Sequence, residues 1–270
     1  MIHSTAVIHP TAIISDGAQI GENTIIGAYS IIGSNVQIGR NNTVASHVVI
    51  EGYTTFGDDN KIFQFASIGA NPQDLKYSGE ASRLTIGSKN IIREYVTLQP
   101  GTQGGGMLTS IGDQNLFMSS SHIAHDVHVG SGCIFANSSA IAGHVVIGNR
   151  VIVAGMVGIH QYVHIGDLSM IGAGSMVSKD IPPYCIAQGD RAGLVGVNKI
   201  GMERAGYDQS QISSVKLIFR KLFLGSGLLR DRISTLSDTT KVDSPESKLL
   251  NFVKTSKRGV CSVRSRIEEE

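Results

Sequence analysis

The histidines of this chain are concentrated in one stretch. The 270 residues include nine, and six of them fall between positions 122 and 164: His122, His125, His128, His144, His160 and His164. A neutral imidazole is a natural general base near pH 7, and an adjacent carboxylate can fix its tautomer and stabilise its charged form. Because Asp126 lies in the same stretch, these residue types suit general-base catalysis.

A spacing of 18 residues relates several of these positions. Adding 18 to 125 gives 143 and then 161, so His125, Gly143 and Gln161 are expected in one column on adjacent turns of the chain. A glycine there could expose its backbone N–H to a developing oxyanion, which would complete an acyl-transfer site. Three histidines could instead hold zinc, and both interpretations stay open at this point. The neighbouring column would contain Asp126, His144 and Tyr162.

The 18-residue period arises from a shorter repeat of six. Every sixth residue is Ile, Val, Leu or Phe from Ile2 to Ile68, and again, one residue out of phase, from Ile111 to Val177. Six residues suit a short strand plus a corner, and three such sides close a triangular coil. We therefore predict a parallel β-helix of about ten coils with an aliphatic interior. The alternative is a globular β-sandwich with coincidental spacing.

The repeat is interrupted twice and then stops. Residues 69–85 and 99–110 are polar and rich in glycine, so we expect loops that leave the coil, where solenoids tend to carry function. After Pro183 the pattern becomes helical, with Asp208 and Ser244 as candidate N-caps. We predict a β-helical domain over residues 1–189 and a small α-helical domain over residues 190–270.

Composition excludes several classes of protein. A formal net charge of +1 excludes a nucleic-acid-binding protein held mainly by bulk charge. With 41% hydrophobic and 17% charged residues, the chain is too apolar to be disordered. No apolar run approaches the roughly 18 residues of a membrane span, and no signal peptide is recognisable. The cysteines show no metal or disulfide spacing, so we expect a cytoplasmic protein.

Six short segments, in order and at characteristic spacing, carry a resemblance to a known family. With the repeat and the helical tail, the chain closely resembles the UDP-N-acetylglucosamine 3-O-acyltransferases, which catalyse the first step of lipid A biosynthesis. The segments are NPQDLKY (71–77), HIAHD (122–126), IAGHV (141–145), GIHQY (158–162), DIPPY (180–184) and GVNKIG (196–201).

The resemblance implies a left-handed parallel β-helix of hexapeptide repeats with a small α-helical C-terminal domain. It also implies a homotrimer with active sites between subunits. The reaction would transfer an (R)-3-hydroxyacyl group from acyl carrier protein to the 3-hydroxyl of UDP-N-acetylglucosamine, with no cofactor and no metal ion. In this family His125 corresponds to the general base, Asp126 to the residue that orients it, and Gly143 to the oxyanion donor.

Further roles follow from the same resemblance. Ala173 and Met170 would set the depth of the acyl groove, and Lys216, Arg220 and Lys221 would dock the acidic carrier protein. The family often has His-Arg where this chain has Gln99-Pro100, and a second arginine where it has Ala205; both departures affect expected basic contacts. Contacts to the nucleotide sugar or the acyl donor are expected from Asp74, Lys76, His122, His144, His160, Gln161, Asn198 and Arg204.

Three other functions were weighed against this one. The N-acyltransferases of the same pathway usually carry an N-terminal uridine-binding domain, whereas here the repeat begins at Ile2. A hexapeptide carbonic anhydrase would need three histidines that converge on zinc across a subunit interface. A structural or ice-binding β-helix would need flat rows of threonine, which the sequence lacks.

Overall fold

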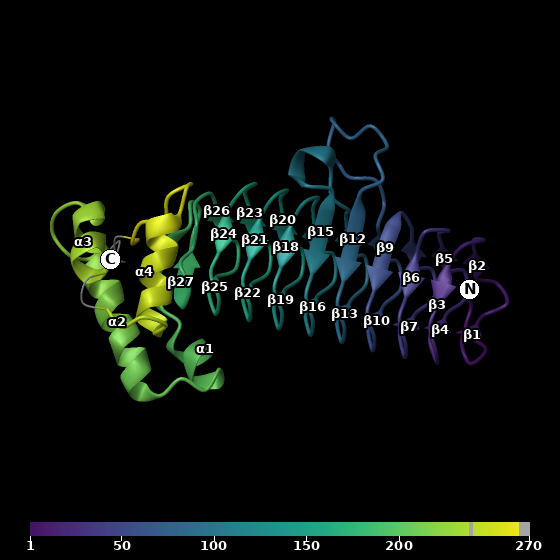
Figure 1. The fold of residues 1–270 in the computed structure, drawn as a ribbon, viewed down its shortest axis with the longest axis horizontal. Helices are drawn as coiled ribbons and strands as arrows, with labels where there is room; N and C mark the ends of the chain where they lie inside the picture. The colour runs from purple at the N-terminus through teal and green to yellow at the C-terminus, as the bar shows by residue number, and fades with distance from the viewer. Residues whose placement is uncertain (238–239, 265–270) are drawn as a thin grey trace.

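The protein is a long three-sided coil that is covered at its C-terminal end by helices (Figure 1). The computed structural model describes residues 1–237 and 240–264. Parallel strands stack into sheets of eleven, nine and eight members, one on each side of the coil. This architecture is the predicted left-handed parallel β-helix of hexapeptide repeats with C-terminal helices.

Each sheet takes every third strand of the chain. The eleven-stranded sheet contains β1 (Val7–Ile8), β4 (Ile25–Ile26), β7 (Thr43–Val44), β10 (Lys61–Ile62), β13 (Ile91–Ile92), β16 (Leu116–Phe117), β19 (Ile134–Phe135), β22 (Ile152–Val153), β25 (Met170–Ile171), β27 (Cys185–Gln188) and β28 (Gly193–Val197). The nine-stranded sheet contains β2 (Ile13–Ile14), β5 (Ile31–Ile32), β8 (Val49–Ile50), β11 (Ser67–Ile68), β14 (Thr97–Leu98), β17 (His122–Ile123), β20 (Ala140–Ile141), β23 (Gly158–Ile159) and β26 (Met176–Val177). The eight-stranded sheet contains β3 (Gln19–Ile20), β6 (Gln37–Ile38), β9 (Tyr53–Phe56), β12 (Arg83–Ile86), β15 (Leu108–Ile111), β18 (His128–Val129), β21 (Val146–Ile147) and β24 (His164–Ile165).

The six-residue repeat has a direct structural cause. The second residue of most two-residue strands is the aliphatic of the repeat, and it points into the coil; Ile26, Ile32 and Val44 are at most 1% exposed. Three residues after the aliphatic the backbone turns the corner in the left-handed region, as at Tyr29 and His47, both with φ of 58°. Inward aliphatics and left-handed corners therefore recur together on every side.

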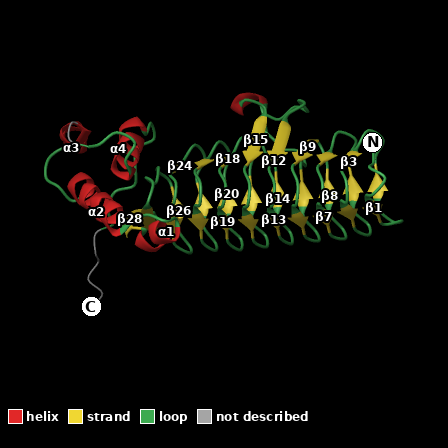
Figure 2. Ribbon diagram, turned by 60° about the horizontal axis from the view of Figure 1, so that its bottom comes forward, coloured by secondary structure: helices red, strands yellow, loops and turns green. Residues whose placement is uncertain are grey.

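The two excursions are shorter than predicted. β12 and β15 each begin before the aliphatic that closes them, because Leu84 and Thr109, two residues upstream, are also fully buried. The loops therefore cover residues 69–82 and 99–107, and the second contains a short 3-10 helix, η1 (Gln103–Gly105). Figures 1 and 2 show both loops rising from one edge of the coil. They touch where the backbone N–H of Gln103 donates to Glu80 Oε1 at 3.0 Å.

The C-terminal region begins as sheet and continues as helix. β28 pairs antiparallel with β27, so the residues just after position 189 still belong to the sheet, and helix begins only at Lys199. Asp208 caps α2 through a capping box and Ser244 caps α4, which confirms both predicted N-caps. None of the helices within the described ranges has the length and apolar character needed to cross a membrane. The helices are α1 (Lys199–Arg204), α2 (Gln209–Phe223), α3 (Leu229–Ser237) and α4 (Pro245–Thr255).

Candidate active site

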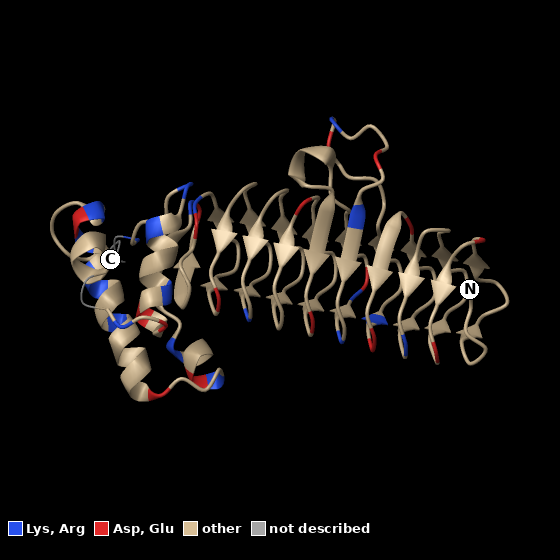
Figure 3. Cartoon of the chain, viewed as in Figure 1, with Lys and Arg blue, Asp and Glu red and all other residues tan. Residues whose placement is uncertain are grey.

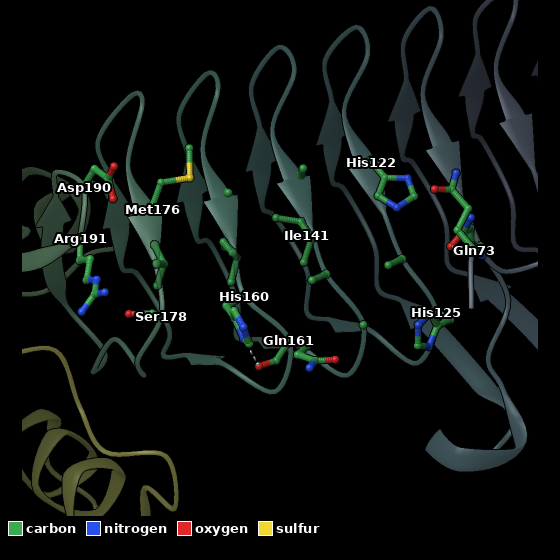
Figure 4. Close-up of a pocket in the computed structure, with 18 residues that line it drawn as sticks. Gln73, His122, His125, Ile141, His160, Gln161, Met176, Ser178, Asp190 and Arg191 are labelled. Carbon is green, nitrogen blue, oxygen red and sulfur yellow. Dashed lines mark hydrogen bonds between the residues drawn. The ribbon is translucent and has the colours of Figure 1, made fainter. Parts of the chain in front are cut away.

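A groove of about 690 Å³ runs along the outer face of the nine-stranded sheet. Its floor follows β17, β20, β23 and β26, which pair in register. Figure 4 shows His125 and Gln73 toward one end and Asp190 and Arg191 toward the other. Five of the predicted site residues line this groove: His122, His125, Gly143, His160 and Gln161.

His125 and Asp126 form a hydrogen-bonded pair beside the groove. The distance between His125 Nδ1 and Asp126 Oδ2 is 2.8 Å, and Asp126 is 2% exposed. Because an ionised carboxylate can only accept hydrogen bonds, Nδ1 carries the proton. His125 Nε2 is therefore left with a lone pair, the form that a general base requires.

The second excursion holds the Asp126 carboxylate in place. Thr102 donates to it twice, from its backbone N–H to Oδ1 at 2.8 Å and from its hydroxyl to Oδ2 at 2.6 Å. Gly105 packs so closely against the carboxylate that a Cβ at this position would collide with it. Asp126 itself lies at a left-handed corner, φ 59°, and donates its N–H to Thr109 Oγ1 at 2.8 Å. The loop thus buries and orients the acid of the pair.

Gly143 lies one coil beyond His125, as the 18-residue spacing predicts. A Cβ at Gly143 would come within 2.6 Å of the His125 ring, so only glycine leaves room for that imidazole. Within the described residues the Gly143 N–H has no hydrogen-bond acceptor. A base and an unoccupied backbone donor therefore lie next to each other, which is the arrangement that acyl transfer needs.

Two further imidazoles in this region are kept neutral by their surroundings. Burial lowers the pKa of His144 below its ordinary value, against an opposing effect of Asp126. Burial, and then the proximity of His125, lowers the pKa of His122, whose Nδ1 lies 2.6 Å from Thr97 Oγ1. His144 stacks on Tyr162 with ring centroids 4.4 Å apart, so the second predicted column is confirmed as well.

A metal ion is a conceivable occupant of this corner. The donor atoms of His125, Asp126 and His144 lie within 4.8 Å of one another. Both oxygens of the carboxylate, however, already accept hydrogen bonds from Thr102 and His125. The geometry is therefore that of an acid orienting a base.

Other predicted residues lie around the groove or away from it. Asp74 and Lys76, in the first excursion, act on the pKa of His144 in opposite directions, so both lie near it. His160 Nδ1 accepts a hydrogen bond from Arg258 Nη2 at 2.9 Å. The Asn198 amide is used within the fold, where it caps α1 and donates to the Leu168 carbonyl at 2.8 Å.

The remaining predicted residues do not line the groove of the single chain. Met170 lies in β25, on another side of the coil, and Ala173 is exposed at the corner that precedes β26. Arg204 ends α1. Lys216, Arg220 and Lys221 lie on α2, at the helical end where Figure 3 shows many basic side chains. Their predicted roles remain predictions.

Several lining residues were not predicted. Met176 could have been found with the same arithmetic, because it follows Gly158 by 18 residues. Gln73 precedes the predicted Asp74, and its N–H donates to Gln99 Oε1 at 3.2 Å, a contact between two loops that no period relates. The others are Ala124, Ala140, Ile141, Ala142, Ile159, Val177, Ser178, Asp190 and Arg191.

The fold and this site together define a class of protein. A β-helix of six-residue repeats that carries a buried His–Asp pair beside a backbone donor is a hexapeptide-repeat acyltransferase. In agreement, residues 17–52 match the family model of the bacterial transferase hexapeptide (six repeats). Residues 180–261 match the model of UDP-N-acetylglucosamine O-acyltransferase, domain 2.

Individual relatives agree with these models. The chain is 48% identical, over 77% of its length and 81% of the relative, to the acyl-[acyl-carrier-protein]–UDP-N-acetylglucosamine O-acyltransferase of Myxococcus xanthus. It is 51% identical to that of Rickettsia bellii, over 80% of its length and 78% of the relative. The structure of UDP-N-acetylglucosamine acyltransferase from Campylobacter jejuni superposes with a TM-score of 0.91 at 35% identity, covering 95% of this chain and 100% of that one.

The chain belongs to the acyl-[acyl-carrier-protein]–UDP-N-acetylglucosamine O-acyltransferase family. The resemblance seen in the sequence is thereby confirmed.

Proposed function

We propose that this protein transfers an (R)-3-hydroxyacyl group from acyl carrier protein to the 3-hydroxyl of UDP-N-acetylglucosamine, the first step of lipid A biosynthesis. The observation that carries the proposal is the contact between the His125–Asp126 pair and Gly143. Membership of the family supplies the substrates.

The mechanism follows from the arrangement of these three residues. His125 Nε2 takes the proton from the sugar 3-hydroxyl as its oxygen attacks the thioester carbonyl carbon. The Gly143 N–H donates to the oxyanion that forms, and Asp126 stabilises the imidazolium. When the tetrahedral intermediate collapses, the C–S bond breaks and the leaving thiolate receives the proton from His125. The ester and the free thiol of the carrier are released, and the base is regenerated.

The other predicted residues complete this proposal. We assign contacts to the nucleotide sugar or acyl donor to His122, His144, His160 and Gln161, and docking of the carrier to the basic face of α2. Asp74, Lys76, Asn198 and Arg204 are proposed nucleotide-sugar contacts. Three cysteines without disulfides, Cys133, Cys185 and Cys261, fit a reducing compartment, so we place the reaction in the cytoplasm.

We also propose a homotrimer in which a neighbouring copy closes the groove. The outer positions of the first coils support an interface, because they expose aliphatic side chains to an unusual degree; Val7 is 59% and Ile13 60% exposed. Light scattering on the eluting protein tests this assembly. A mass of three chains supports it, and a stable monomer that retains full activity contradicts it.

The reaction itself is tested with an acyl-transfer assay. Purified protein is incubated with UDP-N-acetylglucosamine and carrier proteins that bear hydroxyacyl or plain acyl chains, and the acylated nucleotide sugar is detected by mass spectrometry. We expect a product with 3-hydroxyacyl donors. Absence of product with every chain, from folded protein, contradicts the proposal, and metal analysis would then test the carbonic anhydrase alternative.

A further inference from the structure

The floor of the groove is an in-line row of four outward-facing positions. Register pairing places His122, Ala140, Gly158 and Met176 side by side on consecutive coils, which are spaced by about 4.8 Å. After His122 the row presents a methyl group, then no side chain, and then a long thioether. Small residues therefore leave a bare trough that begins beside the catalytic pair and ends at Met176.

The Met176 side chain reaches back along this trough. A Cβ on Gly158 would lie 2.8 Å from Met176 Sδ and 3.7 Å from its Cε, so the thioether covers the glycine one coil away. The backbone of Met176 is held at both ends, by a hydrogen bond from its N–H to Gly189 O at 3.1 Å and one from Ala192 N–H to its carbonyl at 2.8 Å. The position is thus fixed, while the side chain, 45% exposed, closes the trough.

The surface beyond Met176 is polar. Asp190 is the next residue along the row, paired with Met176 in a parallel bridge, and Arg191 follows it; both are exposed. Figure 4 shows these charged side chains at the end of the groove that lies away from His125. An alkyl chain gains nothing by passing them, so the apolar part of the groove ends at the methionine.

We infer that Met176 sets the longest acyl chain that the groove accepts, an inference that rests on the proposed function. The carbonyl carbon must lie beside Gly143, on the coil of Ala140, so the chain has only the Ala140 and Gly158 positions to cover before it meets the thioether. Met170 and Ala173 are absent from this row. Truncating Met176 frees about one coil spacing, roughly 4.8 Å, which an extended alkyl chain crosses in about four C–C bonds.

The test measures chain preference in Met176→Ala. Carrier proteins bearing 3-hydroxyacyl chains that increase by two carbons compete for UDP-N-acetylglucosamine, and the products are counted by mass spectrometry. We expect the preferred chain to lengthen by about two to four carbons, and kcat/KM for the longer chain, relative to the wild-type optimum, to rise about tenfold. Met156→Ala is the matched control, because Met156 is also exposed and lies outside the groove.

Each outcome bears on the inference separately from the proposed function. An unchanged preference in an active Met176→Ala enzyme overturns it, as does an equal shift in Met156→Ala. Met176→Gln retains the length of the side chain and should keep the wild-type limit. Loss of turnover on every chain in both Met176 variants also overturns it, because a residue that only limits length is not needed for chemistry. If the wild type itself transfers no acyl group, it is the proposed function that fails.

Discussion

Two corners of the β-helix stack rings along the coil axis, and only one of them carries the catalytic pair. At the aromatic corner (Tyr29, His47, Phe65 and Tyr95), successive ring centroids lie 5.1 to 5.4 Å apart. At the catalytic corner (Asp126, His144 and Tyr162), the His144 and Tyr162 rings are 4.4 Å apart. The backbone is the same at both, with φ between 58° and 65° at all seven residues.

What differs is the covering of each corner. Three of the four residues of the aromatic corner are large side chains that are 46% to 59% exposed. Over the catalytic corner lies the second excursion, whose Thr102 supplies two hydrogen bonds to Asp126, and the residue that precedes His144 is a glycine. The repeat therefore sets the positions of the side chains, while an interruption of the repeat and one missing side chain create the chemistry.

The largest effect is expected from His125→Ala. The variant should lose most turnover, by roughly 10²–10⁴-fold, because a positioned general base contributes about that much. Nucleotide binding, measured by calorimetry, should change little. His47→Ala at the aromatic corner is the control and should keep wild-type kcat. Wild-type turnover in His125→Ala would remove this residue from the mechanism.

Gly143→Ala should be the next most damaging change. The new methyl would lie 2.6 Å from the His125 ring, so the imidazole or the corner must move and the oxyanion donor is displaced. We expect kcat to fall roughly 10²-fold, the effect of losing one such donor. The matched control is Gly155→Ala, at the same place in Ala154-Gly155-Met156-Val157, where the nearest atom is 3.4 Å away. Equal losses in both variants would indicate general damage to corners.

These two positions also show how far the sequence leads. A period of 18 residues was enough to place His125 over Gly143 and His144 over Tyr162, because a uniform coil converts spacing into contact. Thr102 could not be found in this way, since it reaches Asp126 from a loop that interrupts the count. The Arg258 contact to His160 spans 98 residues and depends on how the helical end folds back. The left-handed sense of the coil came only from the resemblance.

Thr102→Val tests the contribution of the loop to the pair. The change keeps the shape of the side chain but removes the 2.6 Å hydrogen bond to Asp126 Oδ2, while the backbone N–H donor remains. Hydrogen bonds to charged groups contribute about 1.5 kcal/mol or more, so kcat should fall about tenfold. Thr11→Val, which removes the hydroxyl that accepts from Tyr29 N–H at the aromatic corner, should leave kcat unchanged. An unaltered kcat in Thr102→Val would show that the backbone donor alone holds the acid.

The smallest effect concerns pH and His144. Burial lowers the pKa of His144 in the folded protein below its ordinary value of 6.5, so the unfolded chain binds this proton more readily. Stability from this residue is therefore complete above about pH 6.5 and decreases as the pH falls through that value. His144→Phe keeps a ring on Tyr162 but cannot be protonated, so its urea midpoint should fall less than that of the wild type between pH 7.5 and 5.5. His47→Phe makes the same replacement at the aromatic corner. An equal flattening of the pH dependence in both variants would contradict a specific effect of burial at the catalytic corner.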